Sequence, residues 1–144
     1  MMETPMDRID KILNHDLFLY HLGRNNAAEA DRRFCRHGMV HFLDVARIGT
    51  IIALEEGLKI DREWIYAAAL LHDCGKHEQY ENGIPHEQAS ARIAPEILKT
   101  CGFNDEETGV IVTAISRHRD PEAAKEKNLN GILYRADKAC LLYT

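Results

Sequence analysis

The sequence predicts an all-α fold, on three observations. Strand signals are scarce, and the Asn-Gly pairs at residues 82–83 and 130–131 separate helical patterns instead of alternating apolar runs. Apolar residues recur at three- and four-residue spacing over most of the chain. The length of 144 residues, 45% of them hydrophobic, suits one core and is short for two domains. We therefore expect a single helical bundle of about six or seven helices.

The N-terminal segment predicts one amphipathic helix and a short second one. The first helix is expected to begin after Pro5. Its apolar face comprises Ile9, Ile12, Leu13 and Leu17. A loop near the polar stretch GRNNAAEADRR then leads to a short helix at about residues 28–35.

Two longer helices follow, and both carry recognisable end signals. The first covers about residues 38–56, and Gly57 is placed to end it. Asp61 is the expected N-cap of the second, with Ile60 and Ile65 spaced as a hydrophobic staple around it. This second helix ends in the apolar run AAALL, whose three alanines favour close approach of a neighbouring helix.

The next segment is predicted to form a loop followed by a helix, and the helix contains a proline that disfavours it. Residues 74–84, CGKHEQYENGI, are polar and contain two glycines, which predicts a loop. Pro85 suits the first turn of a helix that should end by Gly102. Pro95 lies inside that helix and is expected to kink or split it.

Two helices complete the predicted bundle. Asn104 and Glu107 form a capping-box pattern at the start of one, and Pro121 lies beyond its end. A charged loop, PEAAKEKN, then leads to a last helix at about residues 130–143.

The amino-acid composition limits which classes of partner and which cellular compartment we expect for this protein. A formal net charge of −5 offers no basic footprint for duplex nucleic acid, which favours small ligands or other proteins. No window is apolar for long enough to span a membrane, and the N-terminus does not resemble a signal peptide. The four cysteines form no C-x-x-C pair, so a reduced, cytoplasmic setting with cysteines in the core is expected.

Metal-capable side chains lie on or beside the apolar faces of four predicted helices. They are His41, His72, Asp73, His118 and Asp137. Burying an uncompensated carboxylate costs on the order of several kcal/mol, and no lysine or arginine shares the stripe of Asp137. A divalent metal ion would compensate the charge. Histidines with carboxylates and no thiolate favour iron, manganese, nickel, cobalt or catalytic zinc over structural zinc.

Three segments resemble the HD-domain metal-dependent phosphohydrolases, a family named for an adjacent His-Asp pair. CRHGMVHFLDVARI resembles the first ligand helix of the family, with the ligand at His41. AAALLHDCGK matches the apolar run followed by HD-x-GK, and ILYRADKA matches the final aspartate at Asp137. The resemblance spans roughly residues 36–140. It implies one HD domain over residues 1–144, with N-terminal helices at 1–35 and a metal-site core at 36–144.

Two further histidines resemble the extra ligands of two-metal members, such as the diadenosine tetraphosphate hydrolases of the YqeK type. The implied ligand set is His41, His72, Asp73, His86, His118 and Asp137. In this interpretation Asp73 bridges two ions, with His41 and Asp137 on one side and His86 and His118 on the other. The implied cofactor is one or two divalent ions per chain, with iron, manganese, nickel or cobalt favoured over zinc or magnesium.

The same resemblance implies hydrolysis of phosphoester or phosphoanhydride bonds by a metal-bound hydroxide. Lys76 is the expected catalytic and substrate-binding cation, reaching a phosphate oxygen as a point charge. Arg117 and Arg119 flank His118 and are candidates for holding a second phosphate. The expected substrate is a small phosphorylated molecule, a nucleotide by preference, with no duplex nucleic acid and no membrane as partner; a homodimer stays open.

Several alternatives remain open at this point. A one-metal enzyme resembling 5′-nucleotidases would need only four of the ligands: His41, His72, Asp73 and Asp137. A regulatory domain would bind a nucleotide without turnover, and a di-iron oxygenase would use the same residue types. The Gly-Tyr-Pro motif of the cyclic di-GMP phosphodiesterases is absent from the sequence, which disfavours that substrate.

The remaining histidines have simpler expected roles. His37 lies one helical turn before His41 and competes with it as a ligand, although spacing favours His41. We expect His15, His21 and His77 at the solvent or in loops.

Overall fold

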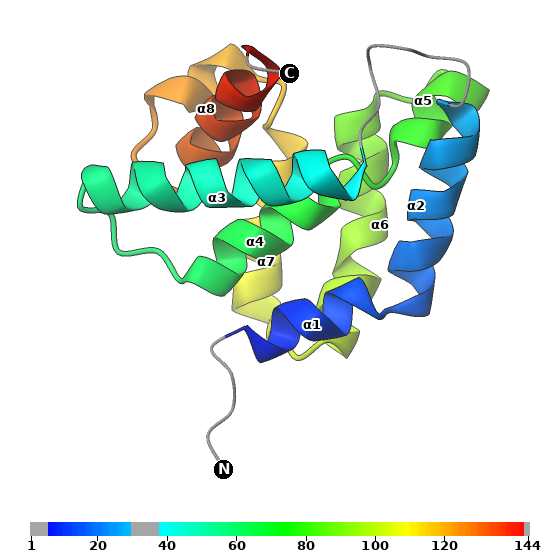
Figure 1. The fold of residues 1–144 in the computed structure, drawn as a ribbon, viewed down its shortest axis with the longest axis horizontal. Coiled ribbons are helices and arrows are strands. Elements are labelled where there is room, and N and C mark those ends of the chain that lie inside the picture. The colour runs from blue at the N-terminus through cyan, green and yellow to red at the C-terminus, as the bar shows by residue number, and fades with distance from the viewer. Residues whose placement is uncertain (1–5, 30–37, 143–144) are drawn as a thin grey trace.

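The computed structural model describes residues 6–29 and 38–142, and all regular structure in these two stretches is helical (Figure 1). In chain order the helices are α1 (Asp7–Leu13), α2 (Asp16–Ala28), α3 (Met39–Glu55), α4 (Arg62–Leu71), α5 (Lys76–Asn82), α6 (His86–Thr100), α7 (Asp105–Ser116), the 3-10 helix η1 (Pro121–Lys125) and α8 (Leu129–Leu142). The predicted all-α class is confirmed. None of these described helices is both long enough and apolar enough to cross a membrane.

Helix α4 is the centre of the bundle. Its residues 67–71 are fully buried, and it packs against α1, α3, α7 and α8. Figure 1 shows α3 lying across the bundle, with α4 on one side of it and α8 on the other. A Cβ at Gly49 of α3 would lie 3.0 Å from Cγ2 of Ile65 and 3.1 Å from Cγ2 of Ile132, so this glycine allows α3 to lie close to both neighbours.

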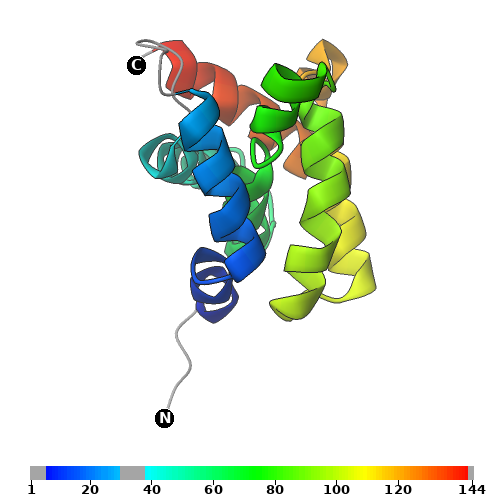
Figure 2. The ribbon, with the colours of Figure 1, turned by 90° about the vertical axis from the view of Figure 1, so that its right-hand side faces the viewer.

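Helices α2, α5 and α6 form the other side of the molecule. Helix α5 contacts both α2 and α6, and α6 packs along α7. In Figure 2, α2 and α6 run alongside each other and α5 lies between their upper ends. Helix α2, in the N-terminal part of the chain, therefore contacts α5, the helix that follows the turn after α4.

The predicted end signals are confirmed where local chemistry sets them. The Asp61 carboxylate accepts a hydrogen bond from the backbone N–H of Glu63 at 2.8 Å and caps α4. Asn104 and Glu107 form the reciprocal capping box of α7. Gly57 follows α3 with φ of 67°, a left-handed conformation that glycine adopts without steric cost.

The first helix begins after Pro5 as predicted, at Asp7, but the other boundaries expected in the described N-terminal residues were wrong. The expected single helix is broken at residues 14–15 into α1 and α2, because the Nδ1 atom of His15 accepts from the backbone N–H of Leu17 and caps a new helix. Helix α2 then continues through the expected loop as far as Ala28. Most of the short helix expected at residues 28–35 lies outside the described residues.

Two further predictions were wrong in the second half of the chain. The expected loop at residues 74–84 contains α5, which ends at Gly83 in the left-handed conformation. Pro95 does not split α6, which is continuous over His86–Thr100. Ala94, Ile97 and Leu98 are buried on either side of the proline, so packing offsets the lost backbone hydrogen bond. Within the described residues, the second N-terminal helix α2 and helix α5 are thus elements that the predicted boundaries did not contain.

Candidate metal centre

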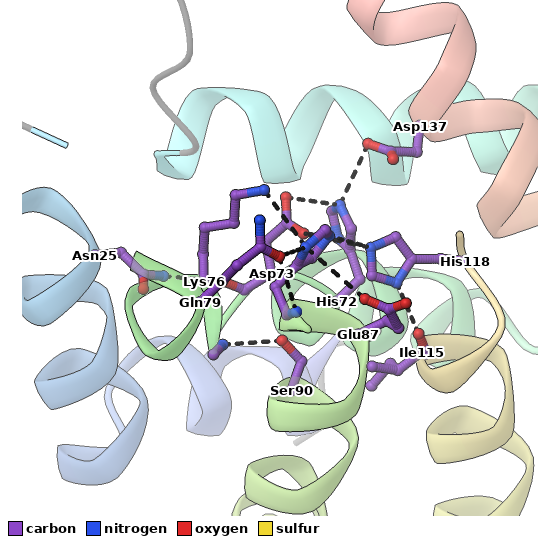
Figure 3. Close-up of polar contacts among 12 residues, drawn as sticks. Asn25, His72, Asp73, Lys76, Gln79, Glu87, Ser90, Ile115, His118 and Asp137 are labelled. Carbon is purple, nitrogen blue, oxygen red and sulfur yellow. Dashed lines mark hydrogen bonds and ion pairs between the residues drawn. The ribbon is translucent and has the colours of Figure 1, made fainter. Parts of the chain in front are cut away.

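Six buried side chains from separate parts of the chain meet at one place in the bundle. Figure 3 labels four of them, His72, Asp73, His118 and Asp137. His41 comes from α3 and Asp137 from α8, while His72 and Asp73 lie in the turn after α4. The last two are His86, the first residue of α6, and His118, directly after α7. The structure therefore brings together all six residues of the predicted ligand set, and their side chains form overlapping groups in which the ligand atoms lie within 4.8 Å of one another.

The two carboxylate oxygens of Asp73 face different histidines. Its Oδ2 atom lies 3.4 Å from Nε2 of His72. Its Oδ1 atom lies 3.3 Å from Nε2 of His86 and 3.4 Å from Nε2 of His118. A carboxylate placed between two groups of nitrogen ligands has the arrangement needed to bridge two cations.

Asp137 faces the other end of the cluster. Its Oδ1 atom lies 3.3 Å from Nε2 of His41 and 3.4 Å from Nε2 of His72. The Nδ1 atom of His41 contacts Sγ of Cys140 at 3.3 Å. Cys140 is buried, so this cysteine is in the core as expected and also packs against a site residue.

Backbone carbonyls fix the tautomers of two site histidines. The Nδ1 atom of His72 lies 2.6 Å from the carbonyl oxygen of Ala69, and that of His118 lies 2.7 Å from the carbonyl oxygen of Ile115. A carbonyl only accepts, so each Nδ1 donates, and in the neutral ring the Nε2 lone pair points into the site. Metal-ligating histidines are oriented by this kind of hydrogen bond.

Gln79 orients His86 in the same way. Its Oε1 atom accepts from the backbone N–H of His86 at 3.1 Å, which identifies this atom as the amide oxygen. The Nδ1 atom of His86, 2.8 Å from the same oxygen, must then donate, which leaves the Nε2 lone pair facing inward. This Nε2 lies 3.1 Å from Nε2 of His118. In neutral rings, two nitrogen lone pairs and an Asp73 oxygen then face one another with no hydrogen between them.

Burial and neighbouring charge act differently on the titratable groups. Burial opposes the charged form of His72, but the carboxylates of Asp73 and Asp137 raise its pKa to about 9. Burial lowers the pKa of His86 to about 3 despite the nearby Asp73 carboxylate. Burial also opposes the charged form of Asp137, but hydrogen bonds from His41 and His72 hold its pKa below the usual range. The electrostatics thus favour positive charge between the two carboxylates.

The turn that carries Asp73 is held by residues that the sequence analysis did not single out. The backbone N–H of Gly75 donates to Oγ of Ser90 at 2.9 Å, and Nδ2 of Asn25 donates to the carbonyl oxygen of Asp73 at 2.9 Å. Gln79 was missed because its segment was expected to be a loop. No spacing rule in the sequence connects Asn25 or Ser90 with this turn, since the contacts span 48 and 15 residues.

The predicted substrate-binding cations lie in different environments. The Nζ atom of Lys76 lies 3.4 Å from Nδ1 of His86, at the edge of the cluster. Arg117 is tied to carboxylates of its own segment, at 3.0 Å from Asp120 and in an ion pair with Glu126. Arg119 is exposed. Lys76 therefore lies at the site, whereas Arg117 forms ion pairs with carboxylates of its own segment.

The other histidines differ in part from expectation. His77 is buried in α5, not at the solvent, and its Nε2 atom lies 2.8 Å from Nδ1 of His21. Burial and the neighbouring His77 ring lower the pKa of His21 to about 4. His15 caps α2, with its Nε2 atom 2.7 Å from Oγ1 of Thr100. His37, the alternative to His41, lies outside the described residues.

Comparison with known proteins gives concordant matches. Residues 38–140 match the HD domain family. An uncharacterized protein of Clostridium beijerinckii is 50% identical over 133 residues, which cover 92% of this chain and 83% of that protein. The crystal structure of a predicted HD superfamily hydrolase from an uncultured Thermotogales bacterium is similar, with a TM-score of 0.63 and 27% identity. That match covers 83% of this chain and 66% of the other, so this chain spans just under two thirds of that protein. This chain belongs to the HD domain family.

Proposed function

We propose that this chain is a metal-dependent phosphohydrolase that cleaves phosphoester or phosphoanhydride bonds of a nucleotide. HD domains bind divalent metals, and the His and Asp clusters of this chain are suited to hold one. The similar Thermotogales protein is described as a predicted hydrolase, which supports the reaction class. The nucleotide preference and the likeness to the two-metal, YqeK-type branch rest on the sequence resemblance.

One observation carries the proposal most directly. The Nε2 atoms of His86 and His118 lie 3.1 Å apart, and each is within 3.4 Å of Oδ1 of Asp73. Both rings are buried and hold their other nitrogen against an oxygen acceptor. Converging acceptors without a proton repel one another in a low-dielectric interior, and a shared cation removes that repulsion. On the other side of Asp73, the buried Nε2 atom of His72 lies 3.4 Å from an oxygen of Asp73 and 3.4 Å from an oxygen of Asp137, which places a further nitrogen between the two carboxylates.

We assign the six residues to two groups around Asp73. His41, His72 and Asp137 would hold one divalent ion, and His86 and His118 the second, with Asp73 shared. Ions at these positions would lower the pKa of water and neutralise charge on phosphoryl oxygens. Lys76 would place a fixed positive charge beside the His86 side of the site, where it orients a phosphate group.

The His118→Ala variant is expected to bind one divalent ion per chain where the unmodified protein binds two. It removes a ligand from one side of Asp73 and leaves the His41, His72 and Asp137 side intact. Elemental analysis of protein loaded with manganese or iron measures the ratio. Asp105→Ala, which changes a side chain that is 93% exposed, is the control and should keep the full complement. A ratio of one ion per chain in both the unmodified protein and His118→Ala would favour the one-metal alternative.

Turnover of a nucleotide panel by the metal-loaded protein tests the reaction class. Release of inorganic phosphate or a mononucleotide that depends on the added metal supports the proposal. Nucleotide binding without turnover under every metal would support a regulatory domain instead.

A further inference from the structure

Asn25 of α2 contacts the turn that carries Asp73, although it lies outside the residues that match the HD domain family. Its side chain is fully buried. The Nδ2 atom donates to the carbonyl oxygen of Asp73 at 2.9 Å, and the Oδ1 atom accepts from the backbone N–H of His77 at 2.8 Å. One amide group thus satisfies both ends of residues 73–77, as the labelled side chain in Figure 3 shows for the Asp73 end.

The two hydrogen bonds restrain the backbone that follows the Cα atom of the candidate ligand Asp73, one at its carbonyl oxygen and one at the N–H of His77. The Asp73 carbonyl oxygen also accepts from the backbone N–H of Lys76 at 3.0 Å, so Asn25 is its second donor. A buried N–H group without a partner costs about 1–3 kcal/mol, so the turn is held where the Asn25 oxygen can accept from the N–H of His77. Ser90 holds the opposite side through the N–H of Gly75. The peptide unit of Asp73 is therefore fixed between α2 and α6, and the direction of its carboxylate follows from that of its backbone.

We propose that Asn25 is a positioning residue of the metal centre and that α2 is an integral part of the site. The inference rests on the proposed metal site, since it concerns the orientation of Asp73 toward the ions. Groups that orient metal ligands typically contribute 10- to 100-fold to metal affinity. The structure places Asn25 in that role through the backbone of the ligand residue.

The Asn25→Asp variant tests the proposal with little change of volume. It keeps an acceptor for the His77 N–H and replaces the donor to the Asp73 carbonyl by an oxygen. We expect its affinity for Co²⁺ to fall by about 10- to 100-fold, with a shifted Co²⁺ absorption spectrum that reports altered ligand geometry. Phe18→Leu, which alters a fully buried contact of the same helix but not the turn, is the control for weakened docking of α2. It should leave the spectrum unchanged.

Hydrogen exchange on the unmodified protein provides a test that needs no variant. Binding and orientation are linked, so Co²⁺ should slow exchange in α2 as well as in residues 73–77. Unmodified protein that binds no Co²⁺ would refute the proposed metal site itself. If the unmodified protein binds Co²⁺, then wild-type affinity and spectrum in Asn25→Asp, or unchanged exchange in α2, would overturn the role of Asn25.

A second, independent feature is the face of α3 that points away from the core. We call its exposed residues, Val40, Asp44, Arg47, Ile51 and Leu54, the α3 stripe. Among the described residues, five large hydrophobic side chains are exposed, and three lie on this helix. Val40 is 75% exposed, Ile51 53% and Leu54 76%. Asp44 and Arg47 lie between them, with side chains 39% and 61% exposed. At about 100° per residue these five positions fall on one face of the helix.

The order of residues on this stripe is self-complementary. Val40 and Ile51 are equally distant from the midpoint between residues 45 and 46, and so are Asp44 and Arg47. Two copies of α3 packed antiparallel about that point would therefore place Val40 against Ile51 of the partner subunit and Asp44 against Arg47 of the partner subunit. A two-fold interface requires this kind of reciprocal pairing.

We infer that the α3 stripe is a contact surface for a second copy of this chain. Charge reversal tests the pairing in solution. Arg47→Asp would set two acidic groups against each other and should convert a dimer to a monomer in analytical ultracentrifugation. The Asp44→Arg/Arg47→Asp double variant restores opposite charges across the two-fold axis and should restore the dimer. A monomeric unmodified protein, or a dimer that survives Arg47→Asp, would overturn the inference.

Cysteine cross-linking tests the register. A Val40→Cys/Ile51→Cys variant should form a disulfide between subunits, because the two positions face each other. Val40→Cys alone should not, since its two copies would lie about 16 Å apart along the helices at about 1.5 Å per residue. Equal cross-linking in both variants would contradict the antiparallel arrangement.

Discussion

The Asp73→Ala variant is expected to lose nearly all bound divalent metal and all hydrolysis of an activated phosphodiester. Its carboxylate faces histidines on both sides of the cluster, through Oδ2 toward His72 and through Oδ1 toward His86 and His118. Its loss should cost more than the roughly 10- to 100-fold in affinity that outer-shell groups contribute. Metal content after dialysis, together with the hydrolysis rate at saturating metal, measures the effect.

Two further variants make this result specific. Asp105→Ala removes a carboxylate whose side chain is 93% exposed, and it should retain metal and activity. Asp73→Asn keeps the shape of the side chain and removes its charge, so it should resemble Asp73→Ala if charge is what holds the ions. Full metal content in Asp73→Ala would contradict the assignment of the centre.

The Gly75→Ala variant is expected to lose stability and the metal bound on the His86 side. A Cβ at this position would lie 2.7 Å from the backbone nitrogen of Ser90 and 2.8 Å from the backbone carbon of Ala89. Neither atom moves without the rest of α6, which carries His86 at its first turn. Overpacking of this kind costs about 1–3 kcal/mol in the free energy of unfolding. Urea unfolding and the metal-to-protein ratio measure the two effects separately.

Gly109→Ala is the matched control for that experiment. Gly109 lies inside α7, and a Cβ there would meet nothing within 4 Å. The substitution should be neutral or stabilise the protein by about 0.5–1 kcal/mol, because alanine has the higher helix propensity. The contrary result is that Gly75→Ala unfolds at the same urea concentration as Gly109→Ala and keeps its metal. That result would show that the position of α6 does not require a glycine at residue 75.

Local chemistry explains which parts of the fold could be predicted from the sequence. The N-cap of α4 at Asp61 and the capping box of Asn104 and Glu107 depend on residues two or three apart, and both were confirmed. The left-handed Gly57 at the end of α3 is equally local. Helix α5 was missed because its segment is polar and rich in turn signals. Its His77 is buried against α2, a contact across 56 residues that no local pattern shows.

Five of the six candidate ligands were predicted from metal-capable side chains on or beside apolar helix faces, where burial without a compensating charge is costly. His86 was added only because the sequence resembles two-metal members of one family. The sequence by itself determined the helical class and several helix ends, and it predicted which six residues form the candidate site. The tertiary structure alone decided how they face one another: which oxygen of Asp73 meets which histidine, and which tautomers the carbonyls of Ala69 and Ile115 impose. It also added Asn25, Gln79 and Ser90 around them. Side-chain directions and supporting hydrogen bonds depend on long-range packing, whereas the tendency to form a helix and to bury one face is local.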